Sequence, residues 1–166
     1  TVQEGDRLLV SGEVVEYRER GYDDAPDLTT TQLVARSLQT VERGVALPAP
    51  VRLGQDGRFP PQQVVDPDHI GQFNPEKNAL DFYESLEGML IEVDELTVVA
   101  PGQHQEVIAT FPLGRAQERT PAAGVLLQQG DVNTNRLFIK WDLPVNVGDR
   151  LEGSLRGVVG YDFSNY

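Results

Sequence analysis

Apolar and polar residues alternate along most of the chain, with the period of two that is typical of β-strands. Near the C-terminus, Leu151, Leu155 and Val159 fall on one side of such a strand. Gly153 and Gly157 lie between them, where a missing side chain lets a strand bend. Strand-favouring and turn-forming residues also outnumber helix-favouring combinations. The pattern therefore predicts an all-β fold with half-buried, bent strands and one short helix.

Two of the predicted strands change their buried face midway. In residues 5–17, the apolar positions before Ser11–Gly12 are out of phase with those after it, so we expect a β-bulge there. In residues 88–99, the apolar face changes between Val93 and Leu96. Such switches let one long strand take part in two parts of a small barrel.

One segment has helical spacing instead. Its apolar residues recur at i, i+3, i+4 and i+7, from Ala79 to Leu86. Asn74 is expected to cap this helix, with Pro75 in its first turn. Gly88 is expected to end it in the left-handed conformation.

The phrase GDRL occurs twice, at residues 5–8 and 148–151, and each copy starts a predicted bent strand. Only the second copy has a complete set of barrel strands before it, including a hairpin expected through residues 124–142. We therefore expect three regions, listed in chain order: residues 1–43 as a partial barrel unit whose strands pack on the main barrel, residues 44–73 as a proline-rich loop with a short strand near Val51, and residues 74–166 as a five-stranded barrel.

The net charge of the chain is strongly negative, and the charged residues are unevenly distributed along it. The 166 residues hold 14 Lys and Arg against 26 Asp and Glu, a net charge of −12. This field repels phosphate backbones and anionic lipids, so a nucleic-acid site would have to be local. Residues 104–166 carry only −1 of that charge, which favours this part of the chain as its location. We expect no insertion into membranes, since no apolar stretch approaches the length of a bilayer-spanning helix.

Candidate catalytic groups are scarce. The chain has no cysteine, which excludes disulfides, thiolate nucleophiles and cysteine zinc sites. His69 and His104 are its two histidines, and both fall in predicted loops, where a solvated histidine is the default. Serine-nucleophile, phosphate-loop and dinucleotide motifs are missing. We therefore expect no catalysis by this chain and no cofactor. Calcium is the one candidate metal ion.

The candidate calcium ligands are Asp23, Asp24 and Asp27, which lie close together in the sequence YDDAPD. Calcium binds to such carboxylate oxygens, although the spacing of a dedicated calcium loop is missing. A solvated acidic hairpin tip is the alternative.

One predicted strand, NRLFIKWD, has the composition of a nucleic-acid platform. Arg136, Phe138 and Lys140 share a face, with the aromatic ring between two cations. Barrels that bind single strands stack bases on such rings while cations follow the backbone. Arg115 and Arg119, on the preceding loop, could extend the surface. The alternative is that Phe138 covers a core while the two cations pair with nearby acids.

Several segments, in conserved order along nearly the whole chain, resemble the region before the catalytic domain of bacterial extracellular nucleases. These are GDRLLVSGEVVEY, TQLVARSLQTV, PAPVRL, ALDFYESLEGMLIEVDELTVV, RTPAAGVLLQQGD, NRLFIKWD and VNVGDRLEGSLRGVVGYDFSNY. The family comprises secreted DNases and sugar-nonspecific nucleases with an endonuclease/exonuclease/phosphatase-type domain. The resemblance implies an oligonucleotide/oligosaccharide-binding (OB) fold, a partial second OB-like unit, and secretion or attachment to the cell surface. It also implies a covalently linked nuclease domain that uses magnesium or calcium.

Two functions follow as alternatives. The first is a non-catalytic OB-fold accessory domain, a monomer that binds or positions nucleic acid, DNA in particular, for the linked nuclease. The second is a structural spacer, or a module that docks a protein or glycan, with no affinity for nucleic acid. The net charge favours the second function, and the resemblance favours the first.

Overall fold

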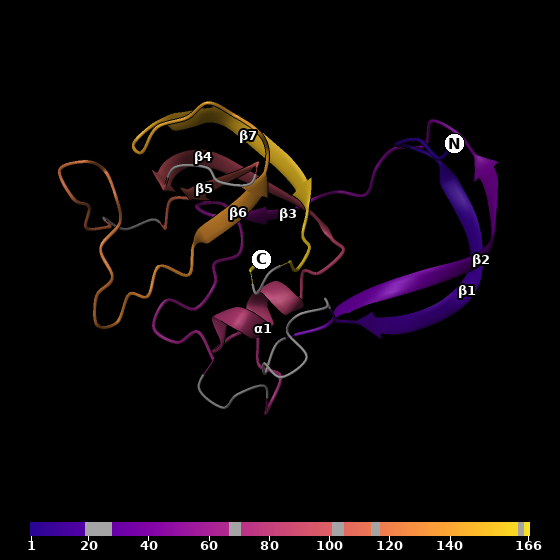
Figure 1. Cartoon of the computed structure of the whole chain (residues 1–166), viewed down its shortest axis with the longest axis horizontal. Helices are drawn as coiled ribbons and strands as arrows, with labels where there is room; N and C mark the ends of the chain where they lie inside the picture. The colour runs from indigo at the N-terminus through magenta and orange to yellow at the C-terminus, as the bar shows by residue number, and fades with distance from the viewer. Residues whose placement is uncertain (19–27, 67–70, 101–104, 114–116, 163–164) are drawn as a thin grey trace. The chain divides into compact units, whose positions relative to one another are not determined.

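The computed structural model describes residues 1–18, 28–66, 71–100, 105–113, 117–162 and 165–166. Strands dominate it and there is one short helix, so the predicted all-β class is confirmed (Figure 1). The chain forms two compact units. The first comprises residues 1–49 with 161–164, and the second comprises residues 50–160 with 165–166.

The first unit is built on an antiparallel hairpin of β1 (Arg7–Tyr17) and β2 (Thr30–Glu42). Its register shifts between Ser11 and Gly12, so the predicted bulge is confirmed. A Cβ on Gly12 would lie 2.3 Å from the carbonyl oxygen of Val34. The two strands therefore approach closely only because this residue has no side chain.

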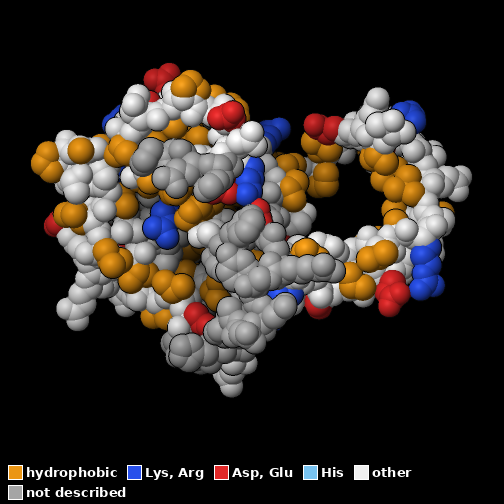
Figure 2. Space-filling view, viewed as in Figure 1, with side chains coloured by type: hydrophobic (Ala, Val, Ile, Leu, Met, Phe, Trp, Pro, Cys, Tyr) orange, Lys and Arg blue, Asp and Glu red, His pale blue; other side chains and the backbone are white. Residues whose placement is uncertain are grey.

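The hairpin exposes both apolar and charged side chains. Val10 lies opposite Leu38 across the two strands, and Leu38 is exposed. Hydrophobic and charged side chains both reach the surface of the molecule (Figure 2). Arg36 pairs with Glu13 at 3.1 Å, one of three ion pairs that the described part of this unit contains. Three of the arginines that the structure describes in this unit thus have a carboxylate partner within it.

The second unit holds the hydrophobic core around a five-stranded sheet. Its strands run in the order β3-β4-β5-β6, and β7 pairs with β4 (Figure 1). In chain order the elements are β3 (Val51–Leu53), α1 (Ala79–Glu84), β4 (Leu90–Ala100), β5 (Glu106–Thr110), β6 (Arg136–Lys140) and β7 (Arg150–Val158). The short strand expected near Val51 is β3, which runs parallel to β4.

Strand β4 is long and pairs with three strands, β3, β5 and β7. Its first part pairs with β7, and its last residues pair with β5. The predicted change of face between Val93 and Leu96 is confirmed, since both are buried although they are three positions apart. The change occurs at Glu95, which has φ 56°, opposite a stretch of β7 where Gly153 has φ 85°. A left-handed residue on each strand resets the register.

Helix α1 and the turn that follows it bury the predicted apolar stripe, with Phe82 in the helix and Leu86 in the turn. Its start differs from the prediction, because the N-cap is Asn78 and not Asn74. The carboxylate of Asp81 accepts bonds from the backbone N–H of Asn74, at 2.6 Å, and from the side chain of Asn78, at 3.0 Å. These bonds hold the residues from Asn74 to Asn78 in a turn before the helix begins. The helix also ends earlier than predicted, at Glu84 with Ser85 as its C-cap, although Gly88 does adopt the left-handed conformation, with φ 71°.

The hairpin expected through residues 124–142 is wrong. Strand β6 pairs with β5, while Val125 and Gln128 form only isolated bridges. An amide cluster, defined here as the half-buried Gln117 with the buried Asn133 and Asn135, orders the long segment between β5 and β6. Asn135 donates to the carbonyl of Phe111 at 2.6 Å, and Gln117 donates to Asn133 at 2.8 Å. In this segment, hydrogen bonds from side-chain amides take the place of the backbone hydrogen bonds that a pair of strands would form.

Replacing Asn135 by alanine should lower the free energy of unfolding by about 1–3 kcal/mol, because the carbonyl of Phe111 would stay buried without its bond. Asn135 is fully buried, so water cannot replace the lost donor. Urea unfolding of the two proteins measures the difference. Asn146→Ala, at an exposed site, is the matched control and should change stability little. Equal effects of the two substitutions would contradict a structural role for the amide cluster.

Candidate nucleic-acid interface

The predicted platform residues share one face of β6. Arg136 and Lys140 are exposed and Phe138 is half-buried, while Leu137, on the other face, is buried. The guanidinium of Arg136 lies 5.3 Å from the centre of the Phe138 ring. Lys140 forms an ion pair with Glu106 of β5. The strand therefore presents an aromatic ring with one stacked cation and one cation that is neutralised by a neighbour.

The adjacent strand β5 extends this face. Ile108 lies opposite Phe138 in the register, and Thr110 lies opposite Arg136. Residues opposite each other in an antiparallel pair project to the same side of the sheet. The platform thus gains an apolar neighbour beside its aromatic ring and a hydroxyl beside its outer cation.

The same register continues across the sheet. Thr110 pairs with Thr97 of β4, and Thr97 pairs with Arg150 of β7. A single line of side chains therefore runs from Arg136 on β6 to Arg150 on β7. Leu96, next to Thr97 in the chain, is buried on the opposite side of the sheet.

Arg119 reaches this line from the loop after β5. Its guanidinium donates to the hydroxyl of Thr110 at 3.1 Å and to the carbonyl of Ala123 at 3.0 Å. Burial lowers the pKa of Arg119, and the positive charge of Arg150 lowers it further. We refer to Arg119, Arg136 and Arg150 as the arginine row.

In the part of the chain that the structure describes, the members of the arginine row lack the carboxylate partners that several other cations of the second unit have. Within the described residues, no ion pair joins any of its three members to a carboxylate, whereas Lys140 pairs with Glu106. The row lies within residues 104–166, the part of the chain that carries the smaller share of the acidic excess.

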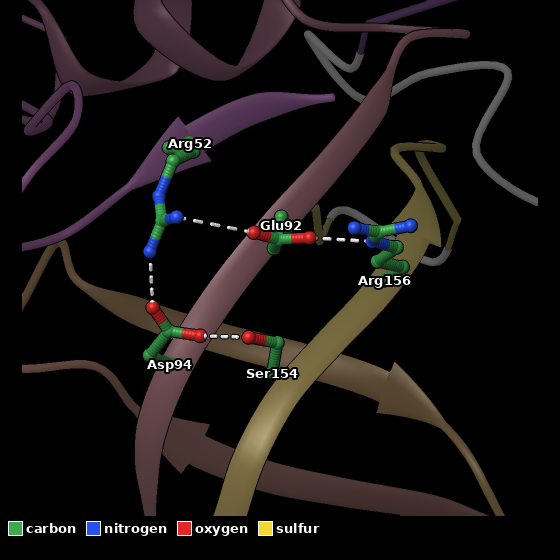
Figure 3. Close-up of polar contacts among 5 residues, drawn as sticks. All are labelled: Arg52, Glu92, Asp94, Ser154 and Arg156. Carbon is green, nitrogen blue, oxygen red and sulfur yellow. Dashed lines mark hydrogen bonds and ion pairs between the residues drawn. The ribbon is translucent and has the colours of Figure 1, made fainter. Parts of the chain in front are cut away.

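A second set of arginines has a structural role. Glu92 of β4 is buried and forms ion pairs with Arg52 of β3, at 3.4 Å, and with Arg156 of β7 (Figure 3). Asp94 accepts from Arg52 and from Ser154. These contacts tie β3 and β7 to β4. Because both arginines are engaged with carboxylates, their charge is largely cancelled locally.

The sequence identified two members of the arginine row and missed Arg150, which lies in the second GDRL phrase and was attributed to a turn and strand start. The sequence feature that could have identified Arg150 is its position next to the apolar Leu151. Alternation along the strand then places the side chain of Arg150 on the polar face of β7. Alternation alone does not identify the neighbour across the sheet, and the neighbour is what gives Arg150 its significance.

Several predicted site residues lie outside the described part of the chain. These are Arg115, Asp23, Asp24, Asp27, His69 and His104. Within the described residues, no three potential metal ligands gather into a cluster. The part of the chain that the structure describes also contains no helix with the length and apolarity needed to span a membrane.

Comparison with known proteins places the chain in a family. No curated protein and no solved structure matches it. A family model described as a domain of unknown function, DUF8508, matches residues 52–166, which include every strand of the second unit except the first residue of β3. The match covers more than half of the chain, and the chain therefore belongs to the DUF8508 family.

Proposed function

We propose that this chain is a non-catalytic, OB-like accessory domain that binds single-stranded or frayed nucleic acid for a linked, metal-dependent nuclease of the secreted bacterial type. The observation that carries the proposal is the arginine row. Three guanidinium groups gather along one line of side chains without an ion-pair partner among the described carboxylates.

Guanidinium groups bind phosphate well because their planar N–H donors match its oxygens. The line of side chains that holds the row crosses four β-strands, so the row would contact successive phosphates of an extended nucleic-acid strand. Beside it, Phe138 and Ile108 offer an apolar surface on which a base could stack, and base stacking contributes about 1–3 kcal/mol. The sheet face therefore combines the two interactions that hold single strands without reading their sequence.

The row favours binding over hydrolysis. Arginine stays protonated, so it stabilises phosphate charge but cannot remove a proton from an attacking water. Hydrolysis would be performed by the linked domain that the resemblance to extracellular nucleases implies. Secretion and the metal requirement belong to that same resemblance.

A spacer or docking module is the second candidate, and specific contacts favour it. The charge of Lys140 is neutralised by Glu106, and the guanidinium of Arg136 already packs against the ring of Phe138. The net charge of −12 also opposes the approach of a polyanion. A strand must displace Arg136 from the ring, or stack beside it, to use the aromatic surface.

Fluorescence anisotropy with a labelled single strand separates the two candidates. Phe138→Leu keeps an apolar side chain but removes the aromatic face, and it should weaken binding at low salt by about 5-fold or more. Phe73→Leu, at a ring that is 64% exposed, is the matched control and should bind like the unmodified protein. If the unmodified protein shows no binding at low salt, the spacer function replaces the proposed one.

A further inference from the structure

A cavity opens beside the arginine row, where β4 and β7 separate at their bulge. Its volume is about 400 Å³. The lining residues are Glu95, Thr97, Pro112, Arg150, Leu151, Glu152 and Gly153. Thr97 and Arg150 belong to both the cavity and the line of side chains across the sheet, so a molecule bound along the row would lie next to the opening.

Unusual backbone builds this cavity. Glu95, with φ 56°, and Gly153, with φ 85°, both line it, and both are left-handed. For a residue with a side chain this conformation is costly, and such strain clusters at binding sites. The strained residue here directs a carboxylate-bearing side chain to the cavity wall.

The cavity wall carries three kinds of group. Pro112 and Leu151 supply apolar surface, Arg150 supplies a cation, and Glu95 and Glu152 supply carboxylates. Ionised carboxylates accept hydrogen bonds and donate none. The walls therefore suit a flat, partly apolar molecule that has N–H donors on one edge and a phosphate nearby.

Resting on the nucleic-acid binding proposed above, we propose that this cavity takes up a nucleobase with an exocyclic amino group, such as cytosine or adenine, from the bound strand. Arg150 would contact the phosphate of that nucleotide, and the ring would lie against Pro112 and Leu151. The amino group would donate to Glu95 or Glu152. Thymine presents a carbonyl oxygen where cytosine presents this amino group, and a carboxylate repels that oxygen.

The test compares oligo-deoxycytidine with oligo-deoxythymidine of equal length by anisotropy at low salt. These two pyrimidines have similar size, and at C4 cytosine presents an amino group where thymine presents a carbonyl oxygen. Thymine also carries an N3–H and a methyl group, so the carboxylate variants below are needed to assign the preference to the amino group. The unmodified protein should bind oligo-deoxycytidine about 5-fold more tightly, as expected for one charge-assisted hydrogen bond. The double substitution Glu95→Gln with Glu152→Gln should bring the ratio close to one, because glutamine can donate to thymine as well.

The control is Glu4→Gln with Glu76→Gln, which removes the same charge at two exposed positions. It should raise both affinities slightly and leave their ratio unchanged. Salt-sensitive binding that is equal for the two oligonucleotides would overturn the cavity proposal and leave the arginine row in place.

Mononucleotides test the cavity with Arg150 as the one member of the arginine row that lines it. Deoxycytidine monophosphate should shift the backbone amide signals of Glu95 and Gly153 in NMR spectra, and deoxythymidine monophosphate should shift them much less. If neither oligonucleotide binds, the proposed function fails, and this arm then decides the cavity alone. Equal shifts, or none, would overturn the cavity proposal.

Discussion

Replacing Phe82 by alanine should lower the free energy of unfolding by about 3–5 kcal/mol, the usual cost of deleting a buried aromatic ring. The Phe82 side chain is 2% exposed and lies at the centre of the core that α1 closes. Its ring meets Tyr83 edge-on at 5.3 Å, and the guanidinium of Arg58 lies 4.8 Å from its centre. Alanine would leave a cavity and remove both ring contacts.

Urea unfolding followed by far-ultraviolet circular dichroism measures this loss. Phe73→Ala is the matched control, because this ring is largely exposed, and it should change stability by less than about 0.5 kcal/mol. A loss at Phe82 no larger than at Phe73 would contradict the placement of the core under α1.

The triple substitution Arg119→Gln, Arg136→Gln and Arg150→Gln should weaken binding of a single strand at low salt by about 100-fold, since each charge-assisted contact contributes roughly 1 kcal/mol. In the proposed function, the three guanidinium groups contact one nucleic-acid strand along one line of side chains, so their loss would remove the positive charge of this sheet face. Anisotropy measures the affinity, and circular dichroism verifies that the variant is folded.

The matched control removes the same charge from the first unit, by replacing Arg7, Arg36 and Arg43 with glutamine. These three arginines are already paired with carboxylates, at 2.7, 3.1 and 3.8 Å. The control should bind nearly as well as the unmodified protein. A similar loss in both triple variants would show that net charge alone controls binding, and that the arginine row has no special role.

The periodicity of apolar residues in the sequence was sufficient to predict the strands and the positions where their register shifts. The change of phase at Ser11–Gly12 and the change between Val93 and Leu96 both correspond to register shifts in the sheets. These features are local, because alternation along one strand reports which face is buried. The apolar stripe of α1 was predicted for the same reason.

Contacts between distant residues were not predictable in this way. Asn74 has the right type and position for a helix cap, but Asp81 holds it in a preceding turn. The amides of Asn133 and Asn135 order a segment whose composition resembles a strand. In both cases side-chain hydrogen bonds compete with the regular structure that the local sequence favours.

The arginine row shows the same limit at the candidate site. Arg136 and Phe138 were found because they lie on one strand, where alternation places them on one face. Arg150 joins them only through the pairing of β7 with β4 and of β4 with β5. Pairing across a sheet depends on the fold as a whole, which one sequence does not reveal.

The salt dependence of single-strand binding tests the central claim most directly. Each phosphate contact adds about 0.7 to the slope of log affinity against log salt concentration for single strands. The triple variant of the arginine row should therefore have a slope that is smaller by about 2, while the triple control in the first unit keeps the slope of the unmodified protein. Equal slopes for all three proteins would contradict phosphate binding by the arginine row.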